Sequence, residues 1–267
     1  MHYNRTILNC AMRCFSYKSW LNSVNGNRWM ANVLKIDRAS EAQSGVLSNS
    51  ASVFELQIID AKLERLDEYL KDFGGFLEMI KAAAIDVCLL GSFTCDIGNQ
   101  NNIYHFWKYK EGYSSLSTRY NLLRNNKDLF HYQQKLDSLL QSRKNQVCLP
   151  FSYWPDPEPR GDSIENIYEL RSYHLKPGTM IEWGNHWAQA IKVRSKNNEA
   201  VAGFFSHIGD MHVVHHLWAY RDLEARRKSR DEIWQDPRWG KCVMNTVPLM
   251  HSMTSSILRP TPYSLLR

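Results

Sequence analysis

The sequence lacks several features that would assign it directly to a class of protein. It contains no apolar run that approaches the roughly 20 residues needed to cross a bilayer as a helix, so no transmembrane helix is predicted. Its six cysteines show no C-x-x-C spacing, so they are expected to be reduced thiols, with no disulfide framework or zinc motif. There is also no Gly-rich phosphate loop and no aspartate-based phosphatase motif.

Acidic residues are absent from residues 1–34, which carry spaced Arg and Lys and many Ser and Asn. This composition is typical of a mitochondrial transit peptide. A secretory signal would need an unbroken apolar stretch of about 7 to 15 residues, whereas Ile7 and Leu8 are followed directly by Asn9. We therefore predict a mitochondrial presequence or disordered segment over residues 1–50, directed to the matrix. A basic tail without a targeting role is the alternative.

The net charge of +6 is concentrated at the N-terminus, because residues 1–45 hold six basic and two acidic residues and so supply +4 of it. The remainder carries only +2, which gives no electrostatic basis for a nucleic-acid interface. With 43% hydrophobic and 22% charged residues, the body is predicted to be globular. A chain of 267 residues accommodates two domains of about 100 residues each.

The body contains an internal repeat. Residues 54–57 (Phe-Glu-Leu-Gln) recur as residues 168–171 (Tyr-Glu-Leu-Arg), each alternating apolar and polar residues as a half-buried strand does. Helical periodicity follows each copy, and residues 105–109 then recur as 216–220 with His, Trp and Tyr at the same positions. Longer helical segments are expected at 113–140 and 221–234, and closing strands at 146–153 and 253–258.

This order, β-α-β-β-α-β, is that of a ferredoxin-like α+β module. We expect an N-terminal module at 53–154, a Pro-rich linker at 155–165 and a C-terminal module at 166–264. One module alone leaves a sheet face and edges uncovered, so the two are predicted to pack as a pseudo-dimer, which forms a dimeric α+β barrel within one chain.

The second copy resembles the NIPSNAP family in residues 167–185, 200–205 and 214–223, and the first copy does so more loosely, including residues 123–127. The sequence is identified as a NIPSNAP member from an invertebrate. This resemblance implies a dimeric α+β barrel and import into mitochondria. It also implies that the protein appears at the outer surface of depolarised mitochondria, where vertebrate members recruit autophagy receptors and their ubiquitin-like partners as a mitophagy signal.

Four histidines, His207, His212, His215 and His216, form the strongest cluster for metal or haem chemistry. If they lie on a strand, His212 and His216 share one face and His215 the other. His105 is the equivalent of His216 in the first copy. Hydrogen-bonded, half-buried strand residues are the alternative interpretation. We assign no catalytic residue, metal ligand or cofactor, and His105 and His216 remain the candidates for cofactor binding.

Residues 263–266 follow the pattern of autophagy-receptor partner motifs, in which an aromatic residue precedes an aliphatic one. Tyr263 and Leu266 are therefore candidates for partner binding, in a tail expected to be exposed after Pro260.

The sequence as a whole favours a non-enzymatic mitochondrial scaffold that binds proteins, with no nucleic-acid partner and with peripheral membrane association or homo-oligomerisation allowed. The alternative is a small-molecule or haem-binding enzyme of the barrel class, similar to a monooxygenase. A barrel centre filled by side chains would favour the scaffold, and a cavity reached by His216 would favour the enzyme.

Overall fold

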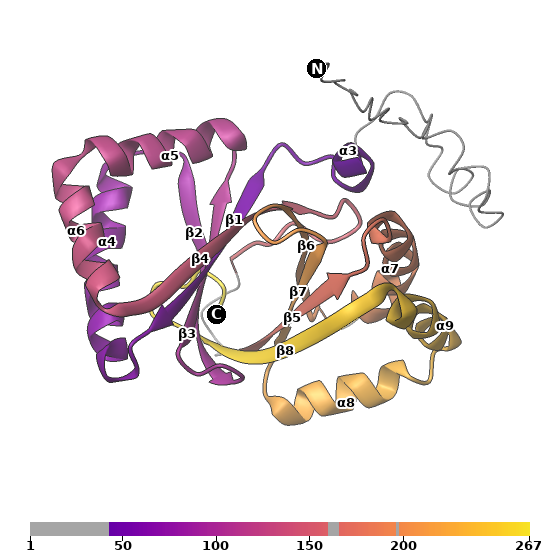
Figure 1. Cartoon of the computed structure of the whole chain (residues 1–267). Helices are drawn as coiled ribbons and strands as arrows, with labels where there is room; N and C mark the ends of the chain where they lie inside the picture. The colour runs from indigo at the N-terminus through magenta and orange to yellow at the C-terminus, as the bar shows by residue number, and fades with distance from the viewer. Residues whose placement is uncertain (1–42, 160–165, 196–197) are drawn as a thin grey trace, which may run out of the picture. The chain divides into compact units, whose positions relative to one another are not determined.

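Two consecutive segments of the chain share one order of strands and helices (Figure 1). The computed structural model describes residues 43–159, 166–195 and 198–267. Residues 1–42, most of the predicted presequence, lie outside the described residues. No helix of the described part is long and apolar enough to cross a membrane.

The first segment begins with a strand and a helix, continues with a hairpin and two helices, and closes with a strand. Its elements are β1 (Val53–Ala61), the short 3-10 helix η1 (Leu63–Arg65), α4 (Leu66–Ala82), β2 (Val87–Ile97), β3 (Asn102–Tyr109), α5 (Tyr113–Asn125), α6 (Lys127–Ser138) and β4 (Leu140–Pro150).

The second segment repeats this order. Its elements are β5 (Ile167–Leu175), α7 (Met180–Arg194), β6 (Ala200–Ile208), β7 (Val213–Tyr220), α8 (Leu223–Ile233), α9 (Pro237–Thr246), the 3-10 helix η3 (Val247–Leu249) and β8 (Met250–Pro260). The two closing strands are longer than the predicted segments 146–153 and 253–258, because their polar first halves carry no apolar signal.

The single helix expected at 113–140 is in fact two helices. The Asn126 side chain accepts the backbone N–H groups of Asp128 and Leu129, which starts α6 anew. In the second segment, Asp222 caps α8, and Asp236 with Pro237 starts the additional helix α9. Asn and Asp at these positions were the available sequence signals.

The eight strands form one closed barrel in the order β1-β3-β2-β8-β5-β7-β6-β4. Each segment contributes four antiparallel strands, and the segments join edge to edge where β2 pairs with β8 and β4 pairs with β6. Closure therefore gives each of these eight strands a neighbour on both sides along at least part of its length.

Alternation along the strands divides the apolar residues into three cores. One lies between the first four strands and helices α4 to α6, and a second between the other strands and helices α7 and α9, on the two sides of the barrel seen in Figure 1. The third lies inside the barrel, where Phe54 contacts Phe204 at 4.7 Å and Phe93 contacts Tyr168 at 4.8 Å between ring centroids. The same interior also holds a cavity of about 500 Å³, with Tyr104, Leu170 and His215 in its lining. Aromatic rings of both segments thus meet at the barrel centre.

The folded part begins before residue 50. The helix α3 (Gln43–Leu47) ends in Leu47, which is buried in the core beside Gly184 of α7. The Leu47 carbonyl also accepts the backbone N–H of Ser152. The expected boundary at residue 50 is therefore too late for the folded part, while removal of a presequence stays a prediction.

The C-terminal tail closes over the first segment. Backbone N–H groups of Leu265 and Leu266 donate to the carbonyl of Leu90 in β2, and Ser264 Oγ accepts the N–H of Ser92. Leu266 is completely buried among the residues inside the barrel. The expectation of an exposed tail is therefore wrong, because the backbone pairing places Leu266 at an apolar position inside the barrel.

Candidate functional site

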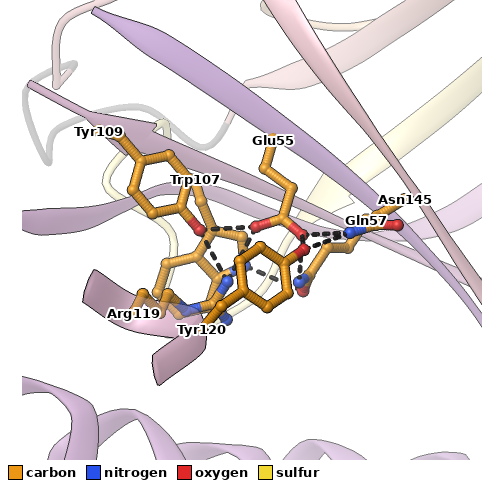
Figure 2. Close-up of polar contacts among 7 residues, drawn as sticks. All are labelled: Glu55, Gln57, Trp107, Tyr109, Arg119, Tyr120 and Asn145. Atoms are coloured by element: carbon orange, nitrogen blue, oxygen red, sulfur yellow. Dashed lines mark hydrogen bonds and ion pairs between the residues drawn. The ribbon is translucent and has the colours of Figure 1, made fainter. Parts of the chain in front are cut away.

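A buried carboxylate forms the centre of a polar network in the first segment (Figure 2). Glu55 lies on β1 opposite Trp107 of β3 and Val147 of β4, on the face covered by helices. Its side chain is completely buried. It accepts hydrogen bonds from Tyr109 Oη at 2.6 Å, Arg119 at 2.8 Å, Tyr120 Oη at 2.9 Å, Asn145 Nδ2 at 2.6 Å and Gln57 Nε2 at 3.0 Å.

The network keeps Glu55 ionised. Burial by itself would raise the pKa of this carboxyl, but the Arg119 charge and the donated hydrogen bonds outweigh it and hold the pKa below its usual value. Arg119 in turn lies 4.2 Å from the Trp107 ring, and the Trp107 indole N–H donates to Gln57. The donors that bind the Glu55 carboxylate are therefore held in place by the fold, and this carboxylate stabilises the folded structure.

The second segment builds a related network around Glu169, which pairs with Trp218 as Glu55 pairs with Trp107. Arg226 of α8 donates to both carboxylate oxygens at 3.0 and 2.7 Å. Burial would raise the pKa of Glu169, whereas the Arg226 hydrogen bonds and the Arg171 charge lower it further than burial raises it. Arg226 remains a quarter exposed, while Arg119 is buried, so the first network is the drier of the two.

Each segment has a cavity between its strands and helices. In the first, a polar cavity of about 400 Å³ adjoins the Glu55 network, with Arg124, Arg143 and Lys144 in its lining. In the second, an aromatic cavity of about 220 Å³ lies among β5, β8 and helices α7 to α9. Tyr173, Trp183, Trp187, Trp234 and Trp239 line this aromatic cavity, together with Arg171, Arg194 and Arg230.

His105 is a structural residue of the first core. Its ring nitrogens lie 3.1 Å from Tyr69 Oη and 3.1 Å from Ser92 Oγ, and its ring stacks on Phe73 at 4.1 Å. Burial lowers the pKa of His105 to about 3, so the imidazole is neutral. It faces the helices and not the barrel interior.

His216 takes the equivalent register position in β7 but has different neighbours. The rings of Trp154, Trp187 and Tyr173 lie within 5.0 Å of it, and neither ring nitrogen has a hydrogen-bond partner among the described residues. Burial and the charge of Arg171 hold its pKa well below the usual value. The ring lies outside the barrel, and His216 does not belong to the lining of the aromatic cavity beside it.

The histidine cluster does not assemble. His212 lies in the turn before β7 with φ 61°, so the expected alternation with His216 does not reach it. His215 faces the barrel interior, where it lies 2.7 Å from Gln146 Oε1 and 2.8 Å from Ser172 Oγ. Within the described ranges, no three His, Cys, Asp or Glu side chains gather as a metal-ligand set.

Tyr263 and Leu266 contribute to the fold in this conformation. Tyr263 donates its hydroxyl hydrogen to the carbonyl of Leu70, and its ring packs on Phe73. Because Leu266 is buried in the barrel, it could bind a partner only after the C-terminal tail detaches from the barrel. That role stays a prediction.

Comparison with known proteins decides the family. The NIPSNAP family model matches residues 168–265. The chain is 42% identical to Protein NipSnap homolog 2 of Homo sapiens over 258 residues, covering 94% of this chain and 90% of that protein. The chain belongs to the NIPSNAP family. Protein NipSnap of Drosophila melanogaster is 38% identical over 240 residues, covering 88% and 87%, which is consistent with the expected invertebrate source.

The fold recurs outside the NIPSNAP family. The structure of an anthrone oxidase-like protein superposes with a TM-score of 0.53 at 9% identity, covering 80% of this chain and 93% of that chain. At this identity the likeness concerns the fold alone. The expected α+β barrel class is confirmed.

The buried carboxylates were not found by sequence reasoning. The alternation of residues 54–57 predicted only a half-buried strand, whereas both faces of β1 are buried at Phe54, Glu55 and Leu56. The available signal was the recurrence of Glu in both copies, at Glu55 and Glu169, together with Trp107 and Trp218 at matching positions.

Proposed function

We propose that this NIPSNAP protein is a mitochondrial scaffold that binds other proteins and does not transform a substrate. The observation that carries the proposal is the packing of the two segments inside the barrel, where Phe54 and Phe93 of the first segment contact Phe204 and Tyr168 of the second. The two buried glutamates are likewise engaged with arginines and hydroxyl donors. These groups stabilise a rigid body whose outer surfaces are available to partners.

The two modules, 53–154 and 166–264, are proposed to be related as the subunits of a dimer would be, with residues 155–165 as the linker. Equivalent register supports this relation, since Glu55 pairs with Trp107 as Glu169 pairs with Trp218. The barrel then serves as the interface between the two copies.

Separating the modules is expected to make each half aggregate or self-associate. A chain of residues 43–159 alone exposes the interior rings of its sheet and the edges of β2 and β4, so it should aggregate or self-associate. The matched control is the intact chain with a protease site within 160–165, which should stay associated after cleavage. Size-exclusion chromatography with light scattering measures both, and a stable monomeric half would contradict the pseudo-dimer.

The partners proposed from the family resemblance are autophagy receptors and their ubiquitin-like proteins, met at the mitochondrial surface after depolarisation. Import into the matrix of healthy mitochondria would be directed by the basic N-terminal segment, which lies mostly outside the described residues. Proximity labelling from the full chain should therefore enrich matrix proteins in resting cells and autophagy receptors after depolarisation.

Charge variants of the N-terminal segment provide the control for that experiment. Arg5→Asp with Arg13→Asp should abolish mitochondrial labelling, whereas Arg5→Lys with Arg13→Lys should preserve it, because the presequence depends on positive charge. If the unaltered chain labelled cytosolic proteins and no mitochondrial proteins, the proposed localisation would be refuted. Mitochondrial labelling without receptor enrichment after depolarisation would refute the recruitment.

A further inference from the structure

The aromatic cavity of the second segment has flat, apolar walls. Trp187 lies 5.9 Å from Trp183 and 5.6 Å from Trp239 between ring centroids. All three indoles are buried, while Trp234 at the edge of the cavity is 55% exposed. The cavity is thus open to solvent beside Trp234. Its volume of about 220 Å³ lies below the roughly 300 to 1,000 Å³ of most ligand pockets, so only a small ligand would fit.

The cavity is also strongly positive. Three arginines line it, and no Asp or Glu belongs to its lining among the described residues. Arg194 donates to Tyr220 Oη at 2.9 Å and lies 4.0 Å from Glu199. Arg171 lies 3.7 Å from Glu169, which Arg226 already binds through both oxygens. The positive charges around the cavity therefore exceed the carboxylates that could neutralise them.

Arg230 of α8 is the cation without a partner. Within the described part of the chain it makes no ion pair, hydrogen bond or ring contact, although it is partly buried. Burial and the neighbouring charges of Arg171 and Arg226 lower its pKa, and together they outweigh the opposing charge of Glu169. A partly buried guanidinium without an ion pair of its own can bind an anion.

We propose that the aromatic cavity binds a small organic carboxylate with a flat or short apolar body. The carboxylate pairs with Arg230, because a guanidinium forms two parallel hydrogen bonds with such a group. The apolar body lies against the tryptophan rings. This site is independent of the proposed scaffold function.

Tryptophan fluorescence tests the site, because four tryptophans line the cavity. Purified protein at pH 7 is titrated with phenylacetate and hexanoate, and in parallel with phenylacetamide and hexanamide, which have the same size but no charge. We expect at least one carboxylate to change the fluorescence saturably, with a Kd at least ten-fold lower than that of its amide. Equal binding of acid and amide, or no saturation by either acid at millimolar concentration, would overturn the proposal.

Two variants of α8 localise the binding. Arg230→Met removes the charge but keeps the aliphatic stem, and should weaken carboxylate binding at least ten-fold without changing amide binding. Arg227→Met is the matched control, since Arg227 is exposed and pairs with Glu224 and Asp231 outside the cavity. Unchanged binding by Arg230→Met would disprove the site. If that variant does not fold, the ratio of the Kd values for acid and amide in the unaltered protein still tests the proposal.

Discussion

Lowering the pH from 7 to 5 is expected to destabilise the folded chain by several kcal/mol, because three imidazoles are buried without charge. Burial lowers the pKa of His105 to about 3 and that of His215 to about 4, and it holds the pKa of His216 well below its usual value. The unfolded chain binds protons at these groups below a pH of about 6.5. Between that pH and the folded pKa values, the unfolded state therefore binds more protons than the folded state. The free energy of unfolding decreases as the pH is lowered through this range.

The size of this effect follows from proton linkage. Each imidazole that stays neutral in the fold reduces stability by about 1.4 kcal/mol per pH unit, which amounts to roughly 2 kcal/mol each at pH 5. The charges near these rings reinforce burial in two cases: Arg119 lowers the pKa of His105, and Arg171 lowers that of His216. For His215, His174 lowers the pKa and Asp210 opposes it.

Urea denaturation at pH 7, 6 and 5 measures the effect, through the slope of the unfolding free energy against pH. Replacing one buried imidazole by His215→Gln should reduce that slope by about one third, since one of three titrating groups is lost. His251→Gln is the control, because His251 is exposed on β8 and its replacement should leave the slope unchanged. A stability that is constant from pH 7 to pH 5 would show that the three rings accept protons in the fold.

Glu55→Ala is expected to reduce the free energy of unfolding by about 3 to 5 kcal/mol, because it leaves the Arg119 guanidinium buried without its counter-ion. Tyr109 and Tyr120 lose their acceptor in the same step. Such a loss is a large part of the roughly 5 to 15 kcal/mol that stabilises a typical domain. Chemical denaturation at pH 7 measures it.

Two companion variants separate burial from charge. Glu169→Ala should have a smaller effect, because Arg226 is a quarter exposed and can regain water. Glu68→Ala removes an exposed pair with Arg65 and should leave the free energy of unfolding nearly unchanged. Equal losses for Glu55→Ala and Glu68→Ala would show that the Glu55 network does not stabilise the fold.

The internal repeat made most of the fold predictable. Matching residues around Glu55 and Glu169 and around His105 and His216 indicated the order of strands and helices, because alternation and helical periodicity are local properties. The helix starts at Asn126 and Asp236 were missed, because a single polar capping residue hardly changes the apolar pattern on either side of it. The length of the polar strand halves in β4 and β8 depends on pairing partners, which composition does not show.

The candidate sites were less predictable. His216 was correctly matched with His105, but only the positions of Trp154 and Trp187 show that the ring is enclosed outside the barrel. The aromatic cavity joins Arg171, Arg230 and Trp239, which are far apart in the sequence and belong to separate elements. No spacing rule connects such residues, because helix docking brings them together.

The sequence by itself determined membership of the NIPSNAP family, the twofold repeat and the order of the elements, because these depend on residues close together in the chain. Only the tertiary structure decided which face of each strand is dry, that Leu266 enters the barrel, and that Arg230 meets aromatic rings without a counter-ion. These properties depend on burial. Burial arises when distant segments exclude water from one another, and it determines the pKa and the pairing of each enclosed charge.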